Sequence, residues 1–111
     1  MDRPTIKSKK GPEAIIQEKI VDKLRRYEWT TFRTHGNEYQ SGFPDLYAMH
    51  RTYGARWIEV KNPVKYEFTP AQLKTFPVFQ SCGVGVWVLT SDDDSEIKKL
   101  HGPANWFVYL L

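Results

Sequence analysis

Residues 57–61 alternate between apolar and polar side chains, and this segment constrains the fold more than any other part of the chain. Alternation with a period of two is typical of a β-strand that has one buried face. Glu59 and Lys61 are therefore predicted to share one face of the strand. The alternate residues, Ile58 and Val60, are expected to point into a core.

The residues before this strand predict its partner. Residues 51–55 are typical of a short turn between antiparallel strands, and a hairpin there brings Asp45 beside Glu59. Neighbouring carboxylates repel each other unless a cation lies between them, and hard oxygen ligands suit Mg²⁺ or Mn²⁺. An ammonium group such as that of Lys61 can stabilise a forming hydroxide and the charge on a phosphate under attack. This pattern predicts a divalent-metal site, although a solvated ion pair and a Pro-Asp turn are the common structural explanations.

Residues 12–24 predict an amphipathic helix that begins with Pro12. Glu13 and Gln17 fall on the same stripe as the apolar residues, whereas Glu18 lies on the solvated side. A buried acid or amide requires polar partners, and a metal site at the end of the core would provide them. Glu13 is therefore expected to complete the metal environment, directly or through water. The alternative is that Glu13, in the first turn, only complements the helix dipole.

Two further strands are predicted at residues 29–35 and 45–50, with the polar loop 36–42 between them. This loop lies beside the acidic pair and is a candidate contact for a sugar-phosphate backbone. Arg33 and His35 are candidate phosphate contacts. The histidines of the chain lack the clustering that is expected of a zinc site.

A second helix is predicted to begin at Thr69-Pro70, with a capping side chain and Pro in the first turn. Leu73, Phe76 and Phe79 are expected to form its core face. Pro77 is expected to shorten or kink the helix, because Pro removes a backbone donor and clashes with the preceding turn.

The C-terminal part of the chain is predicted to begin with a strand at residues 84–90. This segment is nearly all apolar, which predicts burial on both sides and a central position in the sheet. The acidic run 92–94 is interpreted as the cap of a short helix, with a metal cluster as the alternative. Residues 106–111 predict a last strand or an apolar contact surface. Cys82 is expected to be a buried structural thiol and not a nucleophile.

Two segments, 42–46 (Gly-Phe-Pro-Asp-Leu) and 59–63 (Glu-Val-Lys-Asn-Pro), resemble the two halves of the PD-(D/E)XK nuclease motif. With 69–72 (Thr-Pro-Ala-Gln) and Gly83 before a Val-rich strand, they look like the VRR-NUC branch. Its small phage and bacterial members resemble Holliday-junction resolvases. The resemblance covers roughly residues 12–91. It implies an α/β fold with a restriction-endonuclease-like αβββαβ core, in which helices flank a mixed central sheet.

The resemblance also implies an activity, namely Mg²⁺-dependent hydrolysis of phosphodiester bonds in DNA, with Mn²⁺ able to substitute. Asp45 and Glu59 would bind the metal, with the Val60 carbonyl as an added ligand. Lys61 would orient and help to activate the attacking water. Gln72 would position Lys61 or the scissile phosphate, although a solvated Gln at a helix start is the alternative.

The first helix carries the remaining candidates. The spacing of Glu13 and Gln17 looks like the E-x-x-x-Q pattern of the VRR-NUC branch, which supports Glu13 as the helix acid and makes Gln17 a weak candidate DNA contact. Glu18 is the alternative acid, because simpler resolvases carry an acid about one turn further along.

The composition predicts a soluble protein with one domain over residues 12–111 after a basic arm over residues 1–11. A chain of 111 residues can form one hydrophobic core. No apolar run approaches the roughly 20 residues that span a membrane, and no apolar signal peptide is present. The single cysteine cannot form an internal disulfide, which favours a reducing cytoplasm. The resemblance implies that this is the cytoplasm of a bacterial cell or a phage-infected host.

The arm carries the formal net charge of +3, and the rest of the chain is balanced. A basic arm can gather nucleic acid by releasing counterions, or it can simply keep the chain soluble. Lys7, Lys9 and Lys10 are therefore candidate DNA contacts. They would add affinity without sequence specificity.

The expected substrate is branched DNA, selected by its shape, because the chain offers no evident extra domain that reads bases. Resolving a four-way junction in DNA recombination requires two symmetric cuts, which implies a two-fold homodimer. Tyr27, Trp29 and the C-terminal aromatic stretch are the candidate interface residues. The alternatives are a general DNA nickase or nuclease of the same fold, and a non-catalytic DNA-binding module.

Overall fold

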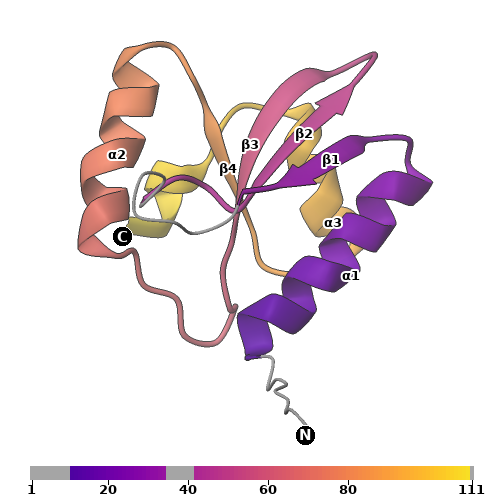
Figure 1. The fold of residues 1–111 in the computed structure, drawn as a ribbon, viewed down its shortest axis with the longest axis horizontal. Coiled ribbons are helices and arrows are strands. Elements are labelled where there is room, and N and C mark those ends of the chain that lie inside the picture. Colours follow the sequence, from indigo (N-terminus) through magenta and orange to yellow (C-terminus); the bar gives the residue numbers. More distant parts are fainter. Residues whose placement is uncertain (1–10, 35–41, 111) are drawn as a thin grey trace, which may run out of the picture.

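The computed structural model describes residues 11–34 and 42–110 and shows a mixed sheet flanked by helices (Figure 1). The elements follow in the order α1 (Pro12–Arg26), β1 (Thr30–Arg33), β2 (Leu46–His50), β3 (Gly54–Val60), α2 (Pro70–Ser81), β4 (Val86–Leu89), α3 (Asp94–Ile97), η3 (Lys98–His101) and η4 (Trp106–Leu110). The strands lie in the order β1-β2-β3-β4, with β4 parallel to β3 and the other pairs antiparallel. This arrangement confirms the predicted αβββαβ core and the α/β fold class.

One face of the sheet packs against α1, α3 and η3. Ile20 and Leu24 of α1 are fully buried, and they belong to the same core as Ile58 and Val60 of β3. Full burial of an aliphatic side chain contributes about 1.5–3 kcal/mol. The predicted alternation of β3 is therefore confirmed, and this core requires Glu59 to lie on the opposite face of the sheet.

The opposite face of the sheet packs against α2 and η4. Phe76 of α2 and Trp106 of η4 form a second buried cluster with Val86 and Val88 of β4. This cluster covers β4 and reaches only the side chain of Trp57 on β3. The second face is thus covered at one side of the sheet.

Helix α2 begins as predicted, at a capping box. The Thr69 hydroxyl accepts a hydrogen bond from the N–H of Gln72, and the Gln72 side chain accepts one from the N–H of Thr69. The prediction that Pro77 shortens the helix is wrong, because α2 continues to Ser81. Leu73 is 48% exposed, so its carbonyl, which Pro77 leaves without a donor, is near solvent.

The predicted core face of α2 is only partly correct. Phe76 is fully buried and Phe79 is partly buried, but Leu73 does not face the core. Leu73 instead lines a surface pocket with Tyr109 and Leu110 of η4. This turn of the apolar face of α2 therefore packs outside the second core cluster.

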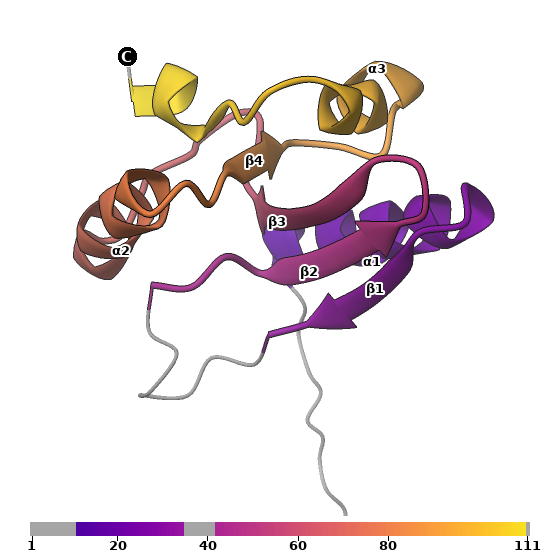
Figure 2. The same ribbon diagram turned by 90° about the horizontal axis from the view of Figure 1, so that it is seen from above.

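The central position predicted for β4 is wrong, because β4 is an edge strand whose residues are all buried. Asn105 covers its outer edge. The side chain of Asn105 accepts a hydrogen bond from the N–H of Val88 (2.6 Å) and donates one to its carbonyl (3.3 Å), and the N–H of Asn105 donates to Val86 (3.2 Å). Figure 2 shows the C-terminal segment beside β4. The apolar sequence of β4 therefore reflects the burial of this strand and not a central position in the sheet.

Three other predictions are corrected by the packing. Residues 106–110 form the 3-10 helix η4 and not a strand, although Phe107 is 48% exposed, in keeping with the predicted apolar surface. Cys82 is exposed, because it is the C-cap residue that follows the last turn of α2 and it belongs to neither core cluster. Trp29 is 3% exposed, since it belongs to the first core, so it cannot be part of a free interface.

The acidic run 92–94 lies at the start of α3. Asp93 is in the N-cap position, but its side chain makes no capping hydrogen bond. Asp94 instead accepts hydrogen bonds from Tyr27 (2.7 Å) and Lys23 (3.2 Å), which tie α3 to α1. Residues 11–34 and 42–110 contain no group of three His, Cys, Asp or Glu side chains that could hold a metal. The acidic run therefore links α3 to α1 through Asp94.

Of the helices that the structure describes, none is both long and apolar enough to cross a membrane. Most of the predicted arm and most of the loop after β1 lie outside the described residues. The candidate DNA contacts in these segments are Lys7, Lys9, Lys10 and His35. The arm and these contacts stay predictions.

Replacing Asn105 with Ala is expected to destabilise the fold by about 1–3 kcal/mol, because the buried N–H of Val88 loses its partner. Urea unfolding followed by circular dichroism measures this change. Ser95→Ala is the control, since Ser95 is exposed and the change should stay within about 0.5 kcal/mol. Equal stabilities of the two variants would show that Asn105 does not hold this edge.

Candidate active site

The β2-β3 hairpin brings Asp45 beside Glu59, as predicted. Leu46 pairs with Ile58, and one more step of this antiparallel register places Asp45 opposite Glu59. The N–H of Val60 donates a hydrogen bond to Asp45 Oδ2 at 2.9 Å. Directly opposed residues of antiparallel strands point to the same face. The two carboxylates therefore lie together on the face that is opposite the first core.

Thr34 holds the chain just before Asp45. Its N–H donates to the Asp45 carbonyl (2.9 Å), and its hydroxyl donates to the Pro44 carbonyl (2.6 Å). These bonds extend the pairing of β1 and β2 beyond the strands. The sequence gives no signal for this role, because the partners are backbone groups whose position depends on the strand register.

Lys61 lies in a buried polar network. Its ammonium nitrogen is 3.2 Å from Glu59 Oε2, 3.0 Å from Gln72 Oε1 and 2.6 Å from the Glu67 carbonyl. The ammonium also lies 4.9 Å from the centre of the Phe68 ring. Lys61 is 3% exposed and Glu59 is 2% exposed. The ammonium group is therefore held in one place by a carboxylate, an amide, a carbonyl and an aromatic ring.

Gln72 connects the first turn of α2 to both charged groups. Its amide nitrogen donates to Glu59 Oε2 at 2.7 Å, while Oε1 accepts from Lys61 and from the Thr69 N–H. The expected reach of Gln72 to Lys61 is thus present, and the solvated alternative is excluded because Gln72 is 8% exposed. The same amide that caps α2 orients the ion pair.

The site contains more negative than positive charge. Asp45, Glu59 and Lys61 together leave one net negative charge when all are ionised, and Glu59 Oε1 is buried with no hydrogen-bond partner among the described residues. A buried carboxylate oxygen without a partner is costly. The arrangement therefore fits a cation beside Glu59 and Asp45.

Burial raises the pKa of Glu59 to about 8, and the charge of Asp45 adds to this rise against the opposing effects of Lys61 and Gln72. Burial also raises the pKa of Asp45, against the hydrogen bond from Val60. Raised pKa values of neighbouring acids are typical of sites where ionisation requires a cation. Two hard carboxylates that resist ionisation alone are suitable ligands for Mg²⁺ or Mn²⁺.

Glu13 lies at the rim of the site. The prediction of a core-facing Glu13 is wrong, because this side chain is exposed at the start of α1. Glu13 Oε2 nevertheless accepts a hydrogen bond from the N–H of Asn62 at 3.4 Å, and its charge contributes to the raised pKa of Asp45. The helix turn that holds Glu13 extends past the core, so Glu13 reaches the site from the solvent side. Glu18 is half-buried.

The other candidate contacts are less directly placed. Arg33 is exposed and donates a hydrogen bond to Gln17 Oε1 at 3.4 Å, so these two side chains pair with each other. The Val60 carbonyl belongs to the last residue of β3, beside the acid pair. Roles for these groups stay predictions.

The raised pKa of Glu59 predicts that stability falls with rising pH. The unfolded carboxyl ionises near 4.5 and the folded one near 8, so the wild type should lose stability relative to Glu59→Gln across this range. Urea unfolding in chelator at about pH 5 and about pH 8.5 measures this difference. At the higher pH, Mg²⁺ at ten times its Kd should raise the free energy of unfolding of the wild type by about 1.4 kcal/mol. Parallel pH profiles for the two proteins would contradict the assignment.

A solved structure resembles this chain in fold. No family model and no curated protein matches the sequence. A solved structure described as "VRR_NUC domain" matches with a TM-score of 0.65 and 22% sequence identity, over 80% of this chain and 94% of that one. Similarity at this level of identity establishes the fold. The chain therefore has the fold of a VRR_NUC domain, as the motifs predicted.

Proposed function

We propose that this protein is a divalent-metal-dependent nuclease that hydrolyses phosphodiester bonds in DNA. The observation that carries this proposal is the buried contact of Lys61 with Glu59 and Gln72 beside Asp45, on a VRR_NUC-like fold. A metal bound there would supply a Lewis acid and lower the pKa of a bound water. The expected metal is Mg²⁺, with Mn²⁺ able to substitute.

Each residue of the site would have its own role in the proposed reaction. Asp45 and Glu59 would hold the metal, with the Val60 carbonyl as an added ligand and Glu13 at the solvent side. Two N–H groups of Lys61 donate to Gln72 and Glu67, so the N–H on the Glu59 side would orient the attacking water. The ammonium charge would stabilise the charge that develops on the phosphate. Gln72 would keep Lys61 in place.

A non-catalytic DNA-binding module explains these features less well. DNA is an anion, and a buried pair of acids with raised pKa values does not attract it. A buried ion pair also adds little net stability, because desolvation offsets its attraction. A metal-dependent reaction would require both the pair of acids, as metal ligands, and the buried Lys61, as the positive group beside them.

Branched DNA is the substrate that we propose, with a two-fold homodimer to make paired cuts. The VRR_NUC-like core occupies most of the described chain, which leaves DNA shape as the main source of selectivity. Phe107 and Leu110 of η4 are both about half exposed and are candidates for the interface. A general nuclease would cut linear and branched DNA alike.

Lys61→Ala is expected to reduce cleavage by about 10²–10³-fold, because the variant loses the group that stabilises the developing charge. The assay follows a labelled four-way junction beside linear duplex and single strands, with Mg²⁺ or with chelator, well below the Tm of each protein. Lys98→Ala is the control, since Lys98 is an exposed lysine. Full Mg²⁺-dependent activity in Lys61→Ala would refute the mechanism, and cleavage of all substrates alike would refute the junction preference.

Gln72→Ala is expected to lower kcat by about 10–100-fold, because Lys61 and Glu59 lose the amide that orients them. Thr69→Ala provides the matched control. It removes the other half of the capping box and costs about 1 kcal/mol of stability, but it leaves the contacts of Gln72 with both charged groups. Equal kcat values for the two variants would show that Gln72 acts only as a helix cap.

A further inference from the structure

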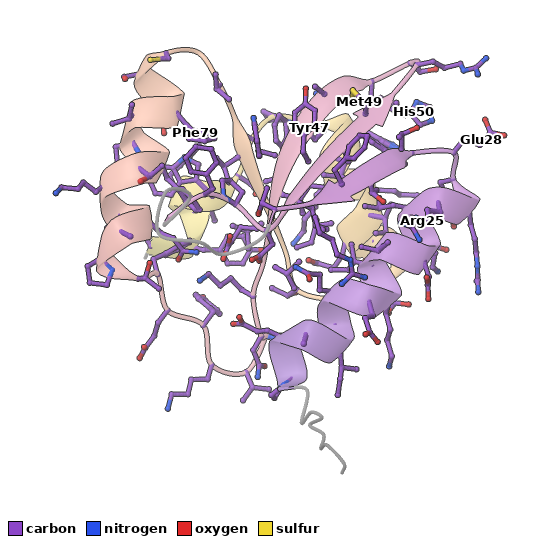
Figure 3. The ribbon with its side chains drawn as sticks, viewed as in Figure 1. Arg25, Glu28, Tyr47, Met49, His50 and Phe79 are labelled. Atoms are coloured by element: carbon purple, nitrogen blue, oxygen red, sulfur yellow. The ribbon has the colours of Figure 1, made fainter. Side chains whose placement is uncertain are left out.

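The face of the sheet that carries Asp45 and Glu59 is covered on one side and open on the other. Helices α2 and η4 cover β4 and the neighbouring part of β3. On β1 and β2 this face is more accessible, with Phe32 53% exposed, Met49 39% exposed and Tyr47 half-buried. Figure 3 shows Tyr47 and Met49 on β2, with Phe79 on α2.

Three aromatic residues form a row across this face. Phe32 pairs with Tyr47, and Tyr47 pairs with Trp57, so their side chains point to the same side of β1, β2 and β3. The rings of Tyr47 and Trp57 lie 4.7 Å apart between their centres. We call Phe32, Tyr47 and Trp57 the aromatic row.

The aromatic row lies next to the two carboxylates. Tyr47 is two residues after Asp45, and Trp57 is two residues before Glu59. Two residues along a strand span about 6.6 Å. Phe43 extends the aromatic surface toward α2, since its ring is 6.0 Å from that of Trp57.

We propose that the aromatic row binds unpaired bases, so that the preferred branched DNA presents an unpaired segment beside the cut. This inference rests on the proposed nuclease function and specifies its substrate. Flat aromatic side chains on the strands of an open sheet stack bases in other nucleic-acid-binding proteins. A base on the row would place its own phosphate or a neighbouring one near Asp45 and Glu59.

The charge of this face favours bases over a duplex backbone. Apart from Glu59, the β1, β2 and β3 residues that share the face of the row are uncharged, namely Thr30, Phe32, Tyr47, Met49, Ala55 and Trp57. A duplex presents only its outward phosphates to such a face, and these require basic side chains. A single strand can also place its bases on the rings, and this stacking tolerates any base sequence.

The position of the row favours nucleic acid over a second copy of the chain. A second protein bound over Phe32 and Tyr47 would lie about two residues along the strand from the two carboxylates. It would block the access of a substrate to them. A strand of DNA can occupy the row and reach the carboxylates at the same time.

The test compares two affinities of the protein, measured by fluorescence anisotropy in the presence of chelator. One ligand is a labelled oligothymidylate of about ten nucleotides, and the other is an abasic strand of equal length. Wild-type protein should prefer the strand with bases by about tenfold, and Phe32→Leu should lose most of this preference. Val78→Ala is the control, because Val78 is similarly exposed (57%) but lies on α2 and not on the row. Phe43→Leu is a second variant on the aromatic surface, with a smaller expected loss.

Each outcome bears on the proposal. A wild type that binds both strands equally, or a preference that Phe32→Leu leaves intact, overturns it. A change of molecular mass for Phe32→Leu in sedimentation, with no change in base preference, shows instead that the row joins two copies. Binding is measured without metal, so it tests the aromatic row independently of cleavage. Cleavage without base preference would contradict only this inference, and base preference without cleavage would contradict only the proposed nuclease function.

Discussion

The buried pair of Lys61 and Glu59 is the interaction on which the site depends. Taking an ammonium and a carboxylate out of water costs several kcal/mol per ion, and their attraction offsets this cost only when further hydrogen bonds are present. The amide of Gln72 and the carbonyl of Glu67 supply these bonds. The pair thereby ties the end of β3 to the start of α2. It leaves Glu59 Oε1 without a hydrogen-bond partner among the described residues, beside Asp45, whose pKa is raised by burial.

The two faces of the sheet serve different purposes. The face toward α1 is closed by aliphatic side chains, which fix the register and hence the side on which Glu59 emerges. The other face is closed over β4, where Phe76 and Trp106 pack, and open over β1 and β2. The acids lie where the closed and open parts of this face meet. Burial raises the pKa values of both acids there, next to the open part of the face.

Much of the fold followed from local patterns. The alternation around Glu59, the turn before it and the Thr69 cap each specify a backbone geometry within a few residues, and all three are present. The place of β4 did not follow, because an apolar strand is equally suited to the centre of a sheet and to an edge that other groups cover. The exposure of Cys82 and Leu73 was missed for a similar reason, since it depends on which residues of α2 the tertiary packing covers.

The sequence alone determined which side chains share a face with Glu59, because the period of a strand is a local property, and it indicated that Asp45, Lys61 and Gln72 belong with it. Only the tertiary structure decided that Gln72 touches both charges, that Thr34 holds the chain before Asp45, and that Glu13 stands at the rim. These contacts join segments far apart in the chain. Their distances depend on how helices pack on the sheet, which no local pattern encodes.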